Sequence, residues 1–148
     1  VSYYQLAVVI GFFVVFLATY FIGGGDTHNM SPETIEQKDY RFMPDWWSIG
    51  IIGYMLMNKE SPFEKYAKTV KQLLDATLTK SWEFTKKAAN FYSPDLKDLI
   101  EKLLTKDPAQ RLGANGDSKE ILAHPVFKKL EGVSADQVDL KADRYDLD

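Results

Sequence analysis

The fold is decided by the segment SPDLKDLIEKLLTKDPAQRLG, residues Ser93–Gly113, which holds the clearest helix signal in the sequence. It opens with a Ser that can cap a helix, a Pro that suits the first helical position and an Asp that complements the positive helix end. Apolar side chains then recur along one stripe, at Leu96, Leu99, Ile100, Leu103 and Leu104. This spacing predicts a helix whose apolar face packs on a core, and Asp107-Pro108 ends it.

Upstream, the apolar stretch WWSIGIIGYMLM (Trp46–Met57) predicts a second core helix. Its twelve residues are too few to cross a bilayer, which takes about 20, so they suit a helix buried within protein. Gly50 and Gly53 would each weaken an isolated helix by about 1 kcal/mol. Their presence therefore predicts close packing of this helix against other elements.

Further helices are expected around this pair. One is predicted from about Glu64 to Lys80 on its apolar stripe, and a short one over Ser118–Ala123. The stretch around Trp82 to Tyr92 is expected to be a loop. No alternating pattern is long enough for a sheet, so the predicted fold class is mainly α.

Composition narrows the classes of function. The 148 residues include 18 basic and 21 acidic side chains, and the net charge is -3. This balance gives no electrostatic reason to bind nucleic acid, which needs clustered Lys and Arg. The absence of Cys excludes disulfides, thiolate catalysis and iron–sulfur clusters. Residues 131–148 are rich in acids, which is typical of a solvated tail.

The N-terminal segment differs sharply from the rest. No charged residue precedes Asp26, and Leu6–Ile22 reads LAVVIGFFVVFLATYFI. As a helix, Val1–Ile22 would measure roughly 33 Å, enough for a hydrocarbon core of about 30 Å. We therefore predict one N-terminal transmembrane helix over residues 1–22. A signal peptide already trimmed at Val1 and a helix of a soluble bundle are the alternatives.

Three blocks after this segment resemble the lower half of a protein kinase C-lobe, most closely the AGC group of Ser/Thr kinases. THNMSPE (Thr27–Glu33) resembles the end of the activation segment with its Ser-Pro-Glu motif. Asp45–Phe63, which begins DWWSIG and ends SPF, resembles the central buried helix and the turn after it. The late blocks SPDLKDLI, KDPAQRLG and HPVF, within Ser93–Phe127, resemble the final helices. The resemblance covers about residues 26–130, in the family's order and spacing.

The resemblance implies a division of the chain and three structural roles. The transmembrane helix (1–22) would be followed by a linker (23–30), a kinase C-lobe-like helical domain (31–130) and the acidic tail (131–148). Glu33 and Arg111 would form a buried ion pair, and Asp45 would brace the backbone of the catalytic loop from below. The alternative is that Glu33 and Arg111 are two unrelated surface charges, which would contribute little to stability.

The sequence lacks the motifs that phosphoryl transfer requires. It has no glycine-rich phosphate loop, no catalytic-loop Asp and Asn, and no metal-binding Asp in a DFG motif. Gly23–Gly25 is not GxGxxG, and Asp26 follows glycines instead of opening DFG. His28 and His124 stand far apart, and no nucleophile elbow or HExxH motif accompanies them. We therefore expect no catalytic residue, cofactor, metal or nucleotide site within the chain.

Two functions follow from these features. The first is a non-catalytic, single-pass membrane-anchored accessory or scaffold subunit, a pseudokinase-like half-lobe in a larger membrane complex. Its partners would be the lipid bilayer and other subunits, and an organellar membrane, such as the mitochondrial inner membrane, is one candidate location. The alternative is a C-lobe fragment of a longer AGC-type Ser/Thr protein kinase that transfers phosphoryl from ATP. In the first hypothesis, the partner-facing apolar helix presents Trp46, Trp47, Ile51, Ile52 and Met55.

Overall fold

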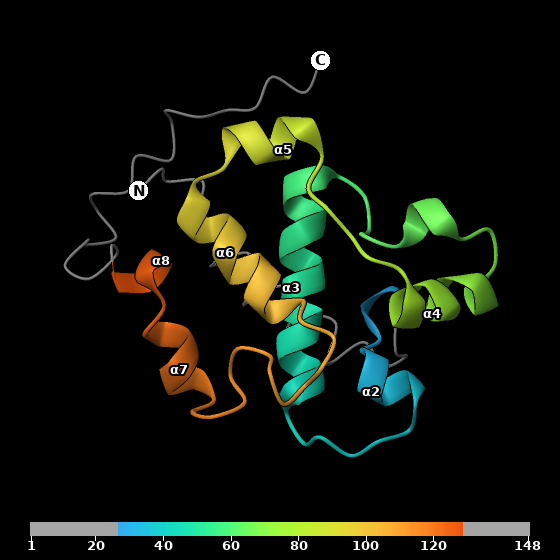
Figure 1. Cartoon of the computed structure of the whole chain (residues 1–148), viewed down its shortest axis with the longest axis horizontal. Coiled ribbons are helices and arrows are strands. Elements are labelled where there is room, and N and C mark those ends of the chain that lie inside the picture. The colour runs from blue at the N-terminus through green and yellow to red at the C-terminus, as the bar shows by residue number, and fades with distance from the viewer. Residues whose placement is uncertain (1–26, 129–148) are drawn as a thin grey trace.

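The computed structural model describes residues 27–128, and helices are the only regular structure in that range. Figure 1 shows α3 at the centre, with α2 and α4 on one side, α7 and α8 on the other, and α5 across the C-terminal end of α3. α6 packs directly against α3. The elements in chain order are η1 Thr27–Asn29, α2 Pro32–Ile35, α3 Met43–Asn58, η2 Glu64–Tyr66, α4 Val70–Thr79, α5 Lys86–Phe91, α6 Pro94–Leu103, α7 Ser118–Leu122 and α8 Pro125–Lys128.

The central helix α3 confirms the core helix predicted over Trp46–Met57 and extends it at both ends. Trp47 and Ile51 are fully buried. A Cβ on Gly50 would lie 2.8 Å from Cδ2 of Leu104, so glycine here lets the backbone of α3 approach the end of α6. The close packing predicted at Gly50 is therefore confirmed.

Helix α6 forms as the sequence predicts. The Ser93 hydroxyl accepts a hydrogen bond from the Leu96 backbone N–H, and Pro94 occupies the first turn. All of the apolar positions of the predicted stripe are buried: Leu96, Leu99, Ile100, Leu103 and Leu104. The apolar stripe thus supplies one wall of the core, and α3 supplies the other.

Two segments differ from the sequence-based prediction. The single helix expected from about Glu64 to Lys80 is two elements, η2 and α4, because Ala67 is extended and Thr69 caps a new helix by accepting from Gln72 N–H. The stretch expected to be a loop contains α5, which Thr85 caps by accepting from Ala88 N–H. α5 has 6 residues, too short for an apolar repeat to reveal it.

The predicted membrane localisation is corrected. Within residues 27–128 no helix is long and apolar enough to cross a bilayer. The longest helix described there, α3, has 16 residues, whereas a span needs about 20, and its apolar surface builds the core of the protein. This finding contradicts the predicted single-pass membrane location, and with it the mitochondrial inner membrane as a candidate, so that prediction is wrong. The segment 1–22, for which the transmembrane helix was predicted, lies outside the described residues, as does the whole acidic tail (131–148).

The end of α3 offers a first test. Lys59 follows the helix in the left-handed region, with φ 64°, and its N–H donates to Met55 O at 2.7 Å. Glycine adopts this conformation without steric cost. We expect Lys59→Gly to raise the free energy of unfolding by about 0.5 kcal/mol, as measured by urea denaturation. Lys87→Gly, inside α5, is the matched control and should lower it by about 1 kcal/mol; equal losses in both variants would contradict the prediction.

Candidate functional site

The short helix α2 places a carboxylate inside the protein. The Ser31 hydroxyl accepts from the Thr34 backbone N–H, and Pro32 begins the helix with its fixed φ. Glu33 occupies the first turn, where a negative charge complements the helix dipole. Its side chain is only 1% exposed. A buried carboxylate of this kind requires a partner that compensates its lost hydration.

That partner is Arg111, which follows the turn after α6. Asp107 shapes this turn: its Oδ1 accepts from Ala109 N–H, and its carbonyl accepts from the Arg111 backbone N–H. The guanidinium donates from Nη1 to Glu33 Oε1 at 2.6 Å and from Nη2 to Glu33 Oε2 at 2.9 Å. This is the bidentate geometry in which a planar guanidinium matches a carboxylate. The structure therefore brings together the two residues that the resemblance implied as a pair.

The remaining donors of the guanidinium are also satisfied. Nη1 donates to Met43 O at 2.8 Å, Nε to Thr105 O at 2.8 Å and Nη2 to Lys106 O at 3.2 Å. With the two bonds to Glu33, every one of the five N–H groups of a guanidinium has an acceptor. The cation also lies 5.1 Å from the ring of Trp47, a favourable contact for a buried charge. A buried pair satisfied in this way can hold two distant segments in one geometry.

The third residue with an implied role, Asp45, lies in the first turn of α3. Desolvation raises the pKa of its carboxyl. Its backbone N–H donates to Phe42 O, while no side-chain hydrogen bond to another described residue is found. The bracing of a catalytic loop by Asp45 remains a prediction, because no such loop lies in residues 27–128.

The predicted partner-facing set on α3 is corrected. Trp47, Ile51 and Ile52 are buried in the core of this same chain, so they do not face a partner. Trp46 is half-buried and donates from Nε1 to Asp117 Oδ1 at 3.0 Å. Met55 alone of the set is exposed, at 38%. The apolar surface of α3 is therefore used mainly within the chain.

The comparisons with known proteins agree with this architecture. The protein kinase domain family matches residues 23–127. The chain belongs to the protein kinase family. The resemblance to a kinase C-lobe of the AGC type is thereby confirmed, since protein kinase C and RAC-beta kinase are among the relatives that match.

The relatives of this kinase chain are far longer than the matched region. It is 34% identical over 109 residues to rat G protein-coupled receptor kinase 4 (72% of this chain, 18% of the relative) and 31% identical over 125 residues to Drosophila melanogaster protein kinase C (84% and 16%). It is 35% identical over 104 residues to human RAC-beta serine/threonine-protein kinase (70% and 20%). The twitchin kinase region from C. elegans matches in structure with a TM-score of 0.59 and 30% identity (68% and 17%). The chain thus spans about a fifth or less of each.

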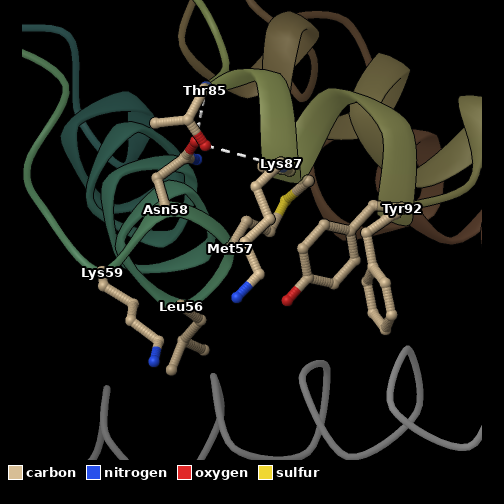
Figure 2. A pocket seen from close by; sticks show the side chains of 9 residues that line it. Leu56, Met57, Asn58, Lys59, Thr85, Lys87 and Tyr92 are labelled. Atoms are coloured by element: carbon tan, nitrogen blue, oxygen red, sulfur yellow. Dashed lines mark hydrogen bonds between the residues drawn. The ribbon is translucent and has the colours of Figure 1, made fainter.

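A pocket of about 300 Å³ lies where α3 ends and α5 begins. Figure 2 shows Lys87 and Tyr92 beside its opening, with Leu56 and Lys59 across from them. Asn58 ties the two walls, because its Oδ1 accepts from the Thr85 backbone N–H at 2.8 Å. The sequence of this kinase chain does not predict the pocket, because the stretch that forms α5 was expected to be a loop.

Neither histidine was expected to be catalytic. In the structure, His124 makes hydrogen bonds that join two helices. It is 5% exposed, and its Nδ1 accepts from Val126 N–H, which leaves Nε2 to donate to Asp98 Oδ2 at 2.8 Å. The pKa of Asp98 is lowered, first by the hydrogen bond from Lys102 and also by the one from His124. In this kinase chain the cluster ties α6 to the start of α8. Among residues 27–128 no group of three or more potential ligands could hold a metal ion.

Proposed function

We propose that the chain is the lower half of the C-lobe of a longer AGC-type Ser/Thr protein kinase, which transfers phosphoryl from ATP to protein. The buried pair between Glu33 and Arg111 carries this proposal, because it is bidentate and joins the two residues that the kinase resemblance implies as a pair. The match to the kinase family over residues 23–127 supports it. The membrane accessory subunit finds no support in the relatives, and we do not propose it.

In this proposal the chain acts by holding the end of the activation segment. Glu33 fixes the segment from below through Arg111. The Ser48 hydroxyl on α3 lies 3.1 Å from both Asn29 O and Pro44 O, and its proton is shared between these two acceptors. The segment between these contacts is therefore attached to both α3 and the turn after α6. Kinase chemistry depends on such positioning, because phosphoryl transfer is catalysed almost entirely by orientation and electrostatics.

The groups that contact ATP would come from sequence outside this chain. Phosphoryl transfer in kinases needs a Lys on the phosphates, a catalytic-loop Asp and a DFG Asp that binds Mg²⁺, and none of these motifs occurs in the sequence. The carboxyl of Asp45 is exposed and makes no side-chain hydrogen bond to residues 27–128, so it is open to accept from backbone N–H groups of a neighbouring catalytic loop.

A transplant tests the proposal. Residues 27–128 would replace the matching region of human RAC-beta kinase, which is 35% identical, and transfer of labelled phosphate to a Ser/Thr peptide would be measured. We expect the chimera to keep kcat/KM within about tenfold of the parent, a change of about 1.4 kcal/mol in activation free energy. Arg111→Ala in the chimera should abolish transfer.

Two controls define the outcome. Glu36→Gln, at the exposed C-cap of α2 three positions after Glu33, should leave the activity of the chimera unchanged. Circular dichroism and thermal melting would show whether each chimera is folded. A folded chimera that transfers no phosphate, beside an active parent, would count against the proposed function.

A further inference from the structure

The connection between α6 and α7 contains an Asn–Gly pair, Asn115-Gly116, the one such pair in the sequence. Both residues are exposed. No hydrogen bond from the Asn115 side-chain amide to another residue in the range 27–128 is found. The other asparagines precede larger residues, in Asn29-Met30, Asn58-Lys59 and Asn90-Phe91. A glycine after Asn leaves the backbone nitrogen open to approach by the Asn side chain, because glycine has no Cβ.

The backbone of this pair is held by one carboxylate. Glu120 Oε2 accepts hydrogen bonds from Gly113 N–H at 3.0 Å, Asn115 N–H at 3.0 Å and Gly116 N–H at 3.2 Å. The negative charge of Glu120 therefore lies directly against the nitrogen atom that could react with the Asn115 side chain.

We propose that Asn115 is a site of spontaneous deamidation whose rate is held down by the carboxylate of Glu120. The Gly116 backbone nitrogen attacks Cγ of Asn115, so that an N–Cγ bond forms and the Cγ–Nδ2 bond breaks. Nδ2 leaves as ammonia with the proton lost from the Gly116 nitrogen. Solvent water then opens the succinimide ring at either carbonyl, which leaves aspartate or isoaspartate at position 115.

Glu120 slows this reaction for two reasons. Its hydrogen bond stabilises the protonated form of the Gly116 nitrogen, whereas the attack requires that proton to leave. The transition state also carries negative charge on the nitrogen and on the oxygen bound to Cγ. A carboxylate at hydrogen-bond distance opposes this charge. Removing the charge of Glu120 while keeping the shape of its side chain should therefore accelerate deamidation.

The product would weaken the same loop. A carboxylate at position 115 is placed beside that of Glu120, which already accepts the position 115 backbone N–H, and like charges repel. The loop also contacts α3, because Asp117 accepts from the Trp46 indole and a Cβ on Gly113 would lie 2.7 Å from that ring. Deamidation should therefore loosen the contact between the loop and α3.

Peptide mapping by mass spectrometry tests the proposal. The full chain would be incubated at physiological temperature and pH, and conversion would be followed at each asparagine. We expect conversion at Asn115 ahead of the other three asparagines. Glu120→Gln should react about fivefold faster, the factor that corresponds to about 1 kcal/mol of Coulomb repulsion in water. Glu101→Gln, an exposed site on α6 with the same loss of charge, should react at the wild-type rate.

Two further measurements test the proposal even if the Glu120→Gln variant does not fold. Wild-type chain in urea, where Glu120 no longer contacts Gly116, should deamidate faster than the native chain. Asn115→Asp should melt at least about 3 °C lower than wild type, and Asn90→Asp, an exposed site on α5, should not. An unreacted Asn115 in the native chain, or equal rates for wild type and Glu120→Gln, or for native and urea-treated chain, would overturn the proposal.

Discussion

Arg111→Ala should lower the free energy of unfolding by about 3–5 kcal/mol, a large part of the stability of a small domain. The substitution leaves the Glu33 carboxylate buried at 1% exposure without its cation. It also removes the donors that satisfy the carbonyl groups of Met43, Thr105 and Lys106. Equilibrium unfolding in urea, followed by circular dichroism, would measure the loss.

A double-mutant cycle separates the pair from its surroundings. Glu33→Ala with Arg111→Ala should cost clearly less than the sum of the single variants, because the double variant leaves no unpaired buried charge. The matched control is Lys38→Ala, which breaks a surface pair with Glu36 at 2.8 Å between side chains 57% and 45% exposed. That change should cost at most about 1 kcal/mol. Similar losses for Lys38→Ala and Arg111→Ala would contradict the structural role of the buried pair.

Trp47→Ala should cost about 3–5 kcal/mol, the range for a large aromatic side chain removed from a core. Trp47 is 0% exposed, stacks on Phe63 with ring centroids 6.1 Å apart and lies under the cation of Arg111. The cavity left by the indole would therefore open beside the buried ion pair. Urea denaturation would measure the change in unfolding free energy.

Trp47→Phe refines this second prediction. The Trp47 indole nitrogen is buried and finds no acceptor among the described residues, so phenylalanine removes an unsatisfied donor while it keeps an aromatic ring in place. The loss should be at least about 1 kcal/mol smaller than for Trp47→Ala. Leu122→Ala, at a side chain 61% exposed, is the control and should change stability by at most about 0.5 kcal/mol. Equal losses in both Trp47 variants would refute this account of the site.

The sequence predicted those parts of the fold whose signals are local. α6 was predicted from its cap and stripe, and α3 from its apolar run, since both patterns repeat over several turns. α5 was missed because 6 residues are too few for a repeat. A largely apolar run such as that of α3 does not reveal whether it packs on its own chain or on another, and for this reason the partner-facing assignment of Trp47 was wrong.

The pairing of Glu33 with Arg111 could be predicted from the sequence only through the kinase resemblance. Glu33 and Arg111 are 78 positions apart, and no periodicity connects charges at that separation. The three backbone acceptors of the guanidinium could not be predicted from residue types, because every residue carries a carbonyl. The membrane localisation was inferred from the composition of residues 1–22 alone, and composition says nothing of what a segment packs against; in residues 27–128 no helix is long and apolar enough to cross a bilayer.

The five acceptors around Arg111 have a consequence for the order in which the domain assembles. They come from three separate stretches of chain: Glu33, the start of α3 at Met43, and the turn at Thr105 and Lys106. A folding intermediate that had docked only one or two of these stretches would enclose a charged group with unmet donors, which is a high-energy state. The hydrogen bonds around Arg111 therefore make partly folded states unfavourable, and they favour unfolding in a single all-or-none transition.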